Sequence, residues 1–211
     1  MVKVKRIICG TVNCYLLSSV DGAVLVDTGE KRYAEKVLQA CQSENVRLLV
    51  LTHGHIDHVQ NAAYLAKHLQ IPVAMNKRDI NLLQNQLSQK MVGEGILGRI
   101  MGAVSKRKML NCEIAGFVPE IHLKAGDSLK DFGVQATVVE LPGHTNGSIG
   151  LDVEERDIIV GDTLMNVLYP CMSCFYHNQD ELKESAGWIQ ELGSRTVYFG
   201  HGSPVENRKW I

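Results

Sequence analysis

The 211-residue chain has little of what marks several classes of protein. It carries 22 basic and 23 acidic residues, so it lacks the excess of positive charge on which nucleic-acid binding relies. No apolar run reaches the roughly 20 residues of a membrane span. Aromatic residues make up only 6%, but hydrophobic residues reach 45% and charged residues 21%, an ordinary globular composition. We therefore expect a small-molecule substrate, with no nucleic-acid and no membrane partner.

The cysteines and the N-terminus predict a location in the reducing cytoplasm. The first ten residues, MVKVKRIICG, include basic residues but no apolar segment or small-residue cleavage pattern of a secretory signal. Cys171 and Cys174 form a Cys-x-x-Cys pair, for which an apolar loop is favoured over a redox function. No disulfide framework is evident, because most of the six cysteines lie in apolar contexts that suit reduced thiols: residues 9, 14, 41, 112, 171 and 174.

The hydrophobic pattern predicts one domain over residues 1–211, with a β-rich start and a βαβ unit. Apolar spacing between residues 78 and 110 is helical but interrupted by glycine, which predicts one or two loose helices. This insert is either a substrate lid or a packing or dimer-contact helix, and the oligomeric state stays open. We expect strands at 2–8, 14–18, 23–26, 48–51, 71–75, 121–123, 134–141, 148–152, 158–160 and 196–199, and helices at 33–44, 59–69 and 180–192.

A dense group of metal-binding residue types follows the buried strand 48–51. The segment Thr52-His53-Gly54-His55-Ile56-Asp57-His58 places three imidazoles and one carboxylate within six positions. Imidazole nitrogens and carboxylate oxygens are ligands for zinc, iron and manganese. With only eight histidines in the chain, chance is a poor explanation of this grouping. The segment predicts a metal site on a strand-to-helix loop.

Three further polar residues share one setting, each directly after a glycine at the end of an apolar strand: His144, Asp162 and His201. Glycine permits the sharp turn that brings the next side chain over the end of a sheet. Gly-Asp is also a common turn, so Asp162 alone would favour a structural role. The complete set predicts that these residues belong to the same site as the histidine cluster.

These motifs together resemble those of the metallo-β-lactamase-fold hydrolases. The segments LVDTG, THGHIDH, LPGHTNGSIG, VGDTL and FGHGSP occur in the family's order, from Asp27 to His201. The resemblance implies a mixed α/β fold, a four-layer αββα sandwich with the metals at one edge of two facing sheets. It also implies that two divalent ions bind, with zinc expected first and iron or manganese as alternatives.

The resemblance assigns a role to each motif residue. Asp162 would bridge the two ions, and Asp27 would support the histidine loop without being a ligand. Asp57 is also the expected catalytic proton acceptor and donor. The implied ligand groups are His53, His55 and His144 for one ion, and Asp57, His58 and His201 for the other.

This ligand set implies a binuclear hydrolase in which a bridging hydroxide attacks a thioester, ester or lactone carbonyl, as in glyoxalase-II-like or lactonase-like enzymes. In β-lactamases a thiol or serine stands at the position of Asp162, and in flavodiiron proteins a glutamate stands at that of His55. The alternatives left open are a metallo-phosphodiesterase and an iron-dependent redox or oxygen-handling protein. Ten residues follow His201, so we do not expect the C-terminal glutathione-binding helices of full-length glyoxalase II.

Residues outside the motifs receive weaker assignments. Tyr169, Tyr176 and His177 follow Asp162 closely and are candidates for substrate contact, although packing is the more frequent role of such tyrosines. His68 and His122 are expected to be structural or solvent-facing. The basic run 106–108 is expected to be a solvated turn without function.

Overall fold

The computed structural model describes residues 1–111 and 113–211, so Cys112 lies outside the described residues. Its larger sheet is mixed and has the strand order β1-β2-β3-β4-β5-β7. The central strand β3 is buried on both faces, as suits a strand paired in parallel with β4. The strands are β1 (Lys3–Cys9), β2 (Val12–Ser18), β3 (Ala23–Val26), β4 (Val46–Val50), β5 (Val73–Met75) and β7 (Ile121–His122).

The second sheet has the order β15-β14-β10-β9-β8, and two short strand pairs accompany it, β11 with β12 and β6 with β13. Strand β10 pairs in parallel with β14 and antiparallel with β9. The strands are β6 (Val92–Gly93), β8 (Ala136–Glu140), β9 (Ile149–Val153), β10 (Asp157–Ile159), β11 (Leu164–Met165), β12 (Cys171–Met172), β13 (Phe175–Tyr176), β14 (Thr196–Tyr198) and β15 (Val205–Glu206).

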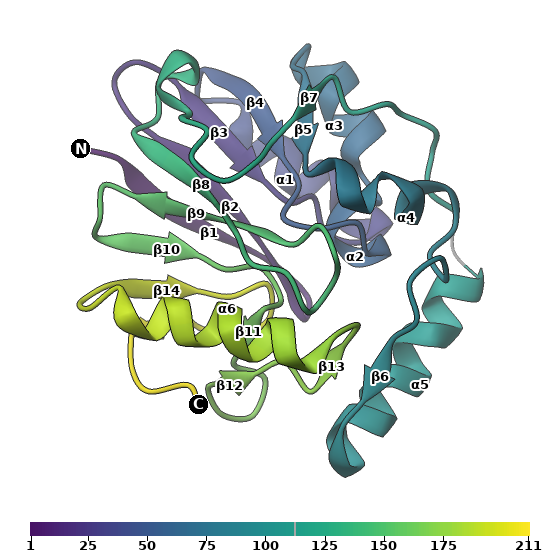
Figure 1. Cartoon of the computed structure of the whole chain (residues 1–211). Coiled ribbons are helices and arrows are strands. Elements are labelled where there is room, and N and C mark those ends of the chain that lie inside the picture. Colours follow the sequence, from purple (N-terminus) through teal and green to yellow (C-terminus); the bar gives the residue numbers. More distant parts are fainter. Residues whose placement is uncertain (112) are drawn as a thin grey trace.

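Helices cover the outer faces of the two sheets (Figure 1). Helices α1 and α3 pack on the larger sheet, and α6 packs on the second sheet. A third apolar cluster fills the space between the sheets, with Leu17 and Val24 from one and Val138 and Leu151 from the other. The helices are η1 (Lys31–Tyr33), α1 (Ala34–Cys41), α2 (Ile56–Val59), α3 (Ala62–Leu69), η2 (Lys77–Asp79), α4 (Ile80–Gln84), α5 (Gly95–Asn111), η3 (Lys130–Phe132) and α6 (Gln179–Glu191).

These layers confirm the expected αββα sandwich, but several element boundaries differ from the predictions. The helix predicted over 33–44 begins as a 3₁₀ turn and ends at Cys41. The helix predicted over 59–69 is α3, which begins only at Ala62, because Val59 belongs to the short helix α2 before it. Asn61 separates these helices, and its side-chain amide donates to the carbonyl oxygens of Thr28, Gly29 and Glu30. A tertiary contact therefore decides where α3 begins.

The insert forms α4, β6 and the single long helix α5, which stands apart from the two sheets in Figure 1. The expectation of a solvated turn at residues 106–108 is wrong, because these residues belong to α5. Gly98 lets the helix approach the strand pair closely, since an added Cβ there would lie 2.3 Å from the carbonyl oxygen of Cys174. Within the described residues, no helix is long and apolar enough to cross a membrane.

Candidate metal centre

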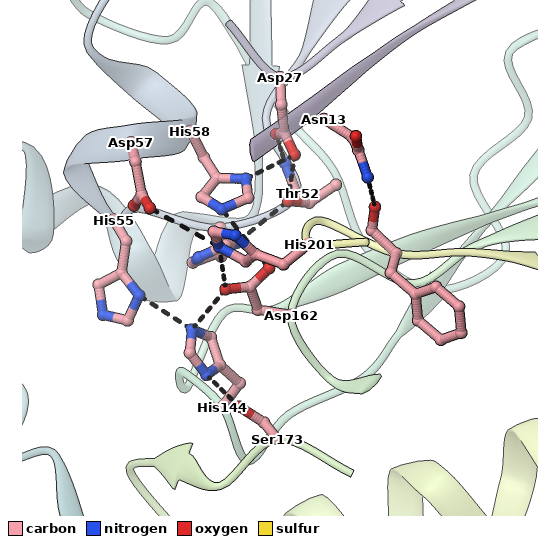
Figure 2. Close-up of polar contacts among 12 residues, drawn as sticks. Asn13, Asp27, Thr52, His55, Asp57, His58, His144, Asp162, Ser173 and His201 are labelled. Carbon is pink, nitrogen blue, oxygen red and sulfur yellow. Dashed lines mark hydrogen bonds and ion pairs between the residues drawn. The ribbon is translucent and has the colours of Figure 1, made fainter. Parts of the chain in front are cut away.

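The seven residues predicted as ligands lie together in one cluster. Figure 2 labels six of them, all except His53, and shows them close to one another. The segment from His53 to His58 follows β4 and enters α2, whereas His144 lies between β8 and β9. Asp162 follows β10, and His201 follows β14. Within each of three groups, potential ligand atoms lie within 4.8 Å of one another: His53, His55 and His144; His53, His58 and Asp162; and Asp57, His58 and His201.

Asp27 orients two of the histidines from the end of β3. Its Oδ1 accepts from the backbone N–H of Thr52 at 2.8 Å, and its Oδ2 lies 2.8 Å from both Thr52 Oγ1 and His58 Nδ1. Its φ of 59° is uncommon for a residue other than glycine, although Asp is among the side chains that tolerate it. This backbone conformation places one buried carboxylate against both the histidine loop and α2.

A hydrogen-bond chain from Asp27 determines the tautomer of His53. The Thr52 hydroxyl donates its proton to Asp27 Oδ2 and therefore accepts from His53 Nδ1–H, at 3.0 Å. The neutral ring of His53 then carries no proton on Nε2. This Nε2 is buried and has no hydrogen-bond partner among residues 1–111 and 113–211. A bare nitrogen of this kind is suited to bind a metal ion.

His144 and His201 are oriented by backbone carbonyl groups. His144 Nδ1 donates to the carbonyl of Phe175 at 2.7 Å, and His201 Nδ1 donates to that of Thr11 at 2.8 Å. Their Nε2 atoms face Asp162 Oδ2 at 3.7 and 3.2 Å, and His58 Nε2 lies 3.5 Å from Asp162 Oδ1. Asp162 is thus the residue on which imidazoles from three segments converge.

His55 is oriented differently from the other histidines. Its Nδ1 lies 2.9 Å from His144 Nε2, while its own Nε2 is buried without a partner in the described structure. Because the proton of neutral His144 is on Nδ1, its Nε2 has only a lone pair to offer. His55 Nδ1 and His144 Nε2 therefore point at the same small volume. A proton or a metal ion must lie between them, because two lone pairs would otherwise face each other.

The protonation states of His53, His55 and Asp162 suit cation binding. Burial, with His58 and His144, lowers the pKa of His53 well below its usual value, and burial with His144 lowers the pKa of His55 to about 3. Although burial alone would raise it, His201 and His58 hold the pKa of Asp162 well below its ordinary range. Near neutral pH these residues are neutral imidazoles and a carboxylate, the protonation states that metal ligation requires.

Four buried polar atoms of this cluster have no hydrogen-bond partner in the described part of the chain: His53 Nε2, His55 Nε2, His58 Nε2 and Asp162 Oδ1. Leaving such atoms unsatisfied is costly, at about 1–3 kcal/mol each. Gly200 leaves room for the arrangement, since an added Cβ would lie 2.0 Å from Asp162 Oδ1. The nitrogen and oxygen donor set fits divalent metal ions such as zinc.

A family model described as the metallo-beta-lactamase superfamily matches residues 7–201, which include every residue of this cluster. The chain belongs to the metallo-beta-lactamase superfamily. Its motifs are therefore placed in the sandwich as the resemblance implied, and the residues suit metal binding.

Two relatives and one solved structure illustrate the range of this superfamily. An uncharacterized protein from Aquifex aeolicus is 30% identical, covering 73% of this chain and 65% of its own length. A hydroxyacylglutathione hydrolase, GloC, from Haemophilus influenzae is 28% identical, covering 72% and 66%. The chain thus spans slightly less than two thirds of both relatives. A structure described as TTHA1623 in a di-iron-bound form has a TM-score of 0.67 and 23% identity, covering 97% of this chain and 94% of that chain.

The structure adds Asp79, which the sequence reasoning missed. Asp79 is fully buried, and its Oδ2 accepts from Gly54 N at 2.9 Å and from Thr145 Oγ1 at 2.7 Å. Its Oδ1 accepts from Gln89 Nε2 at 2.9 Å and Gly147 N at 2.8 Å. One carboxylate therefore joins the loop of His53 and His55 to the loop of His144. Its sequence context, at the end of Lys-Arg-Asp, offers no signal beyond that of a helix start.

Asn13 is a second positioning residue that the sequence reasoning missed. Its side-chain amide donates to the carbonyl oxygens of Phe199 and Gly202, at 3.0 and 2.7 Å, on either side of His201. Its backbone N–H donates to the carbonyl of Gly200 at 2.7 Å. Because Asn13 belongs to β2, the first sheet holds the loop that carries His201 on the second.

The three candidates for substrate contact do not line the cavity of about 290 Å³ that reaches His55, Asp57, His144, Asp162 and His201. Tyr169 is 63% exposed, and the Tyr176 hydroxyl donates to Glu94 Oε2 at 3.1 Å. His177 Nδ1 donates to the backbone carbonyl of Lys90 at 2.8 Å. Their predicted contact with substrate stays a prediction.

Proposed function

We propose that this protein is a binuclear metal-dependent hydrolase that cleaves a thioester, ester or lactone. The observation that carries the proposal is the convergence of three imidazole nitrogens and one carboxylate oxygen, none with a hydrogen-bond partner in the described structure, in a buried cluster that opens into a cavity. Such a donor set has no use in packing, because every one of these atoms costs free energy while it stays unsatisfied.

Two ions are proposed because two of the three donor groups share no residue, and Asp162 lies beside both of them. His53, His55 and His144 would bind one ion, and Asp57, His58 and His201 the other, with zinc expected first. When bound, the ions supply an acidified water and polarise the carbonyl under attack. Asp27 and Asp79 orient the ligands, through the hydrogen bonds described above, before any ion binds.

Asp57 is the proposed catalytic proton carrier. Although burial opposes this, His58 and His201 lower the pKa of Asp57, so its side chain is anionic near neutral pH. It lines the cavity, and its Oδ2 lies 3.7 Å from His201 Nε2. From this position the carboxylate takes a proton from the attacking water and passes it to the departing thiolate or alkoxide. The products are a carboxylic acid and a thiol or alcohol.

The class of substrate is supported by the carboxylate at position 162 and by the relative named as a hydroxyacylglutathione hydrolase. Because that relative is only 28% identical and the match covers 66% of its length, the leaving group stays part of the proposal. A phosphodiester is tested in the same panel, since two adjacent ions also suit attack at phosphorus.

The experiment combines metal analysis with a substrate panel. The purified protein is stripped with a chelator, reloaded with zinc, manganese or iron(II), and assayed on an acyl thioester, a p-nitrophenyl ester, a lactone and bis(p-nitrophenyl) phosphate. We expect two ions per chain and metal-dependent cleavage of a carbonyl substrate, abolished by Asp162→Ala but retained in the exposed control Asp131→Ala. Full carbonyl hydrolysis by the stripped protein, or turnover of the phosphodiester alone, would refute the proposal.

A further inference from the structure

Helix α5 forms one wall of the cavity that opens from the candidate metal centre. Ile100, Val104 and Met109 of this helix line the same cavity as Asp57, His144, Asp162 and His201. Figure 1 shows α5 outside the two sheets that carry the cluster. The helix therefore contributes none of the proposed metal ligands. Its cavity-lining side chains would contact a substrate bound in the cavity.

Most residues that line this cavity away from the cluster are apolar, although Thr11, Ser105 and Lys108 line it too. Met165 and Phe175, on the body of the protein, are buried. On α5 itself, Ile100 and Val104 are 58% and 54% exposed. Exposed aliphatic side chains that adjoin buried apolar ones, around a few polar groups, are typical of a small-molecule site.

Contacts along its length hold α5 in position over the site. Gly102 packs against the Phe175 ring, where an added Cβ would lie 3.1 Å from the nearest ring carbon. Toward the C-terminal end of the helix, Lys108 Nζ lies 2.5 Å from Glu30 Oε1, in the loop after β3. These contacts fix the apolar side chains of α5 at the edge of the cavity.

The same ion pair argues against a charged substrate group along this wall. Of the described residues that line the cavity, Lys108 is the one lysine or arginine, and Glu30 already pairs with it. An anionic substrate group would have to compete with Glu30 for this cation. An apolar group instead gains by removing Ile100 and Val104 from water.

We propose that the substrate carries an apolar chain that lies along Ile100 and Val104, while its carbonyl sits at Asp57 and Asp162. This inference rests on the proposed hydrolase function and specifies its substrate class. The cavity of about 290 Å³ has room for a group on the order of ten water molecules in volume, which suits a medium-length acyl or alkylthio chain.

Binding of the acid product tests the subsite without turnover. Acetate, butyrate, hexanoate and octanoate are titrated into the zinc-loaded protein by calorimetry. We expect affinity to rise by about two- to fourfold per added methylene, because each buried methylene contributes on that order. The product thiols from ethanethiol to octanethiol are titrated in the same way, and affinity that is independent of chain length in both series would overturn the inference.

Kinetics locate the chain on one side of the scissile bond. One series varies the acyl group of p-nitrophenyl esters from acetyl to octanoyl, and the other varies the alkyl thiol of acetyl thioesters. A rise of kcat/KM with chain length in either series supports the subsite and identifies the side. Hydrolysis that is independent of length in both series would refute the subsite but leave the proposed function intact. Conversely, length-dependent binding with no hydrolysis would refute the function and retain the subsite.

A matched pair of variants on α5 tests whether the dependence of affinity on chain length comes from the side chains that line the cavity. Ile100→Ser removes an apolar side chain from the cavity, whereas Ile96→Ser changes the same residue type one turn earlier, 81% exposed and outside the cavity lining. We expect Ile100→Ser to lower the affinity for octanoate, or for octanethiol if the thiol series is the length-dependent one, by roughly three- to tenfold and to leave acetate and ethanethiol unchanged. Ile96→Ser should change none of these affinities. Equal losses in both variants would show that the helix, and not its cavity face, is responsible, and would overturn the inference.

Discussion

Replacing Asp79 by asparagine tests how the loops of the metal centre are held. The buried carboxylate accepts two hydrogen bonds on each oxygen, and one donor of each pair is a backbone N–H, that of Gly54 or Gly147. Asparagine keeps the shape but turns one acceptor into a donor. In either amide orientation, one buried backbone N–H then faces an NH₂ group.

The magnitude follows from these contacts. A buried donor without an acceptor costs about 1–3 kcal/mol, and weakening of the second bond on that oxygen adds about 0.5–1.5 kcal/mol. We therefore expect a loss of about 2–4 kcal/mol in the free energy of unfolding, which for a chain of this size lowers Tm by roughly 5–15 °C. Because Gly54 lies between His53 and His55, zinc affinity should also fall, by about 10- to 100-fold.

Differential scanning fluorimetry of the metal-free protein measures the first effect, and competition with a chromophoric zinc chelator measures the second. Asp131→Asn, an exposed aspartate of η3, makes the same chemical change away from the site and should alter neither quantity. A normal Tm together with zinc affinity within about twofold of the parent in Asp79→Asn would show that this carboxylate does not position the loops.

Three further outcomes are expected. Asp27→Ala leaves Thr52 N–H and His58 Nδ1 without their acceptor, so zinc affinity should fall about 10- to 100-fold in a chelator competition, and parent-like affinity would contradict this. Gly200→Ala places a Cβ against Asp162 Oδ1, so the zinc stoichiometry by mass spectrometry should drop, and two tightly bound ions would count against the packing argument. Burial opposes charge on His58, but Asp162 and Asp27 raise its pKa to about 10, so zinc binding at pH 7 should release a proton from it. The number of protons released should decline as pH rises through 10. Calorimetry in buffers of different ionisation enthalpy measures this number, and a number that does not change with pH would contradict the prediction.

Much of the sandwich could be predicted, because its strands and outer helices have periodic apolar patterns. The strands at 23–26 and 158–160 agree closely with β3 and β10, since short apolar runs bounded by turns are local signals. The ends of α1 and α3 were less accurate, because contacts such as those of Asn61 with residues 28–30 determine them. The insert was expected as one or two loose helices, and its glycines instead allow α5 to approach β6 and β13.

By itself, the sequence determined the chemistry of the cluster, since the spacing of His53, His55, Asp57 and His58 and the glycines before His144, Asp162 and His201 are local features. The tertiary structure decided how these groups are used. It shows which ring nitrogens point toward the metal site, because the acceptors of the other ring nitrogens come from Thr52, Phe175, Thr11 and Asp27. It also reveals Asp79 and the wall formed by α5, whose roles depend on residues distant in sequence. Contacts between residues distant in sequence produce no periodic pattern or local motif by which they could be predicted.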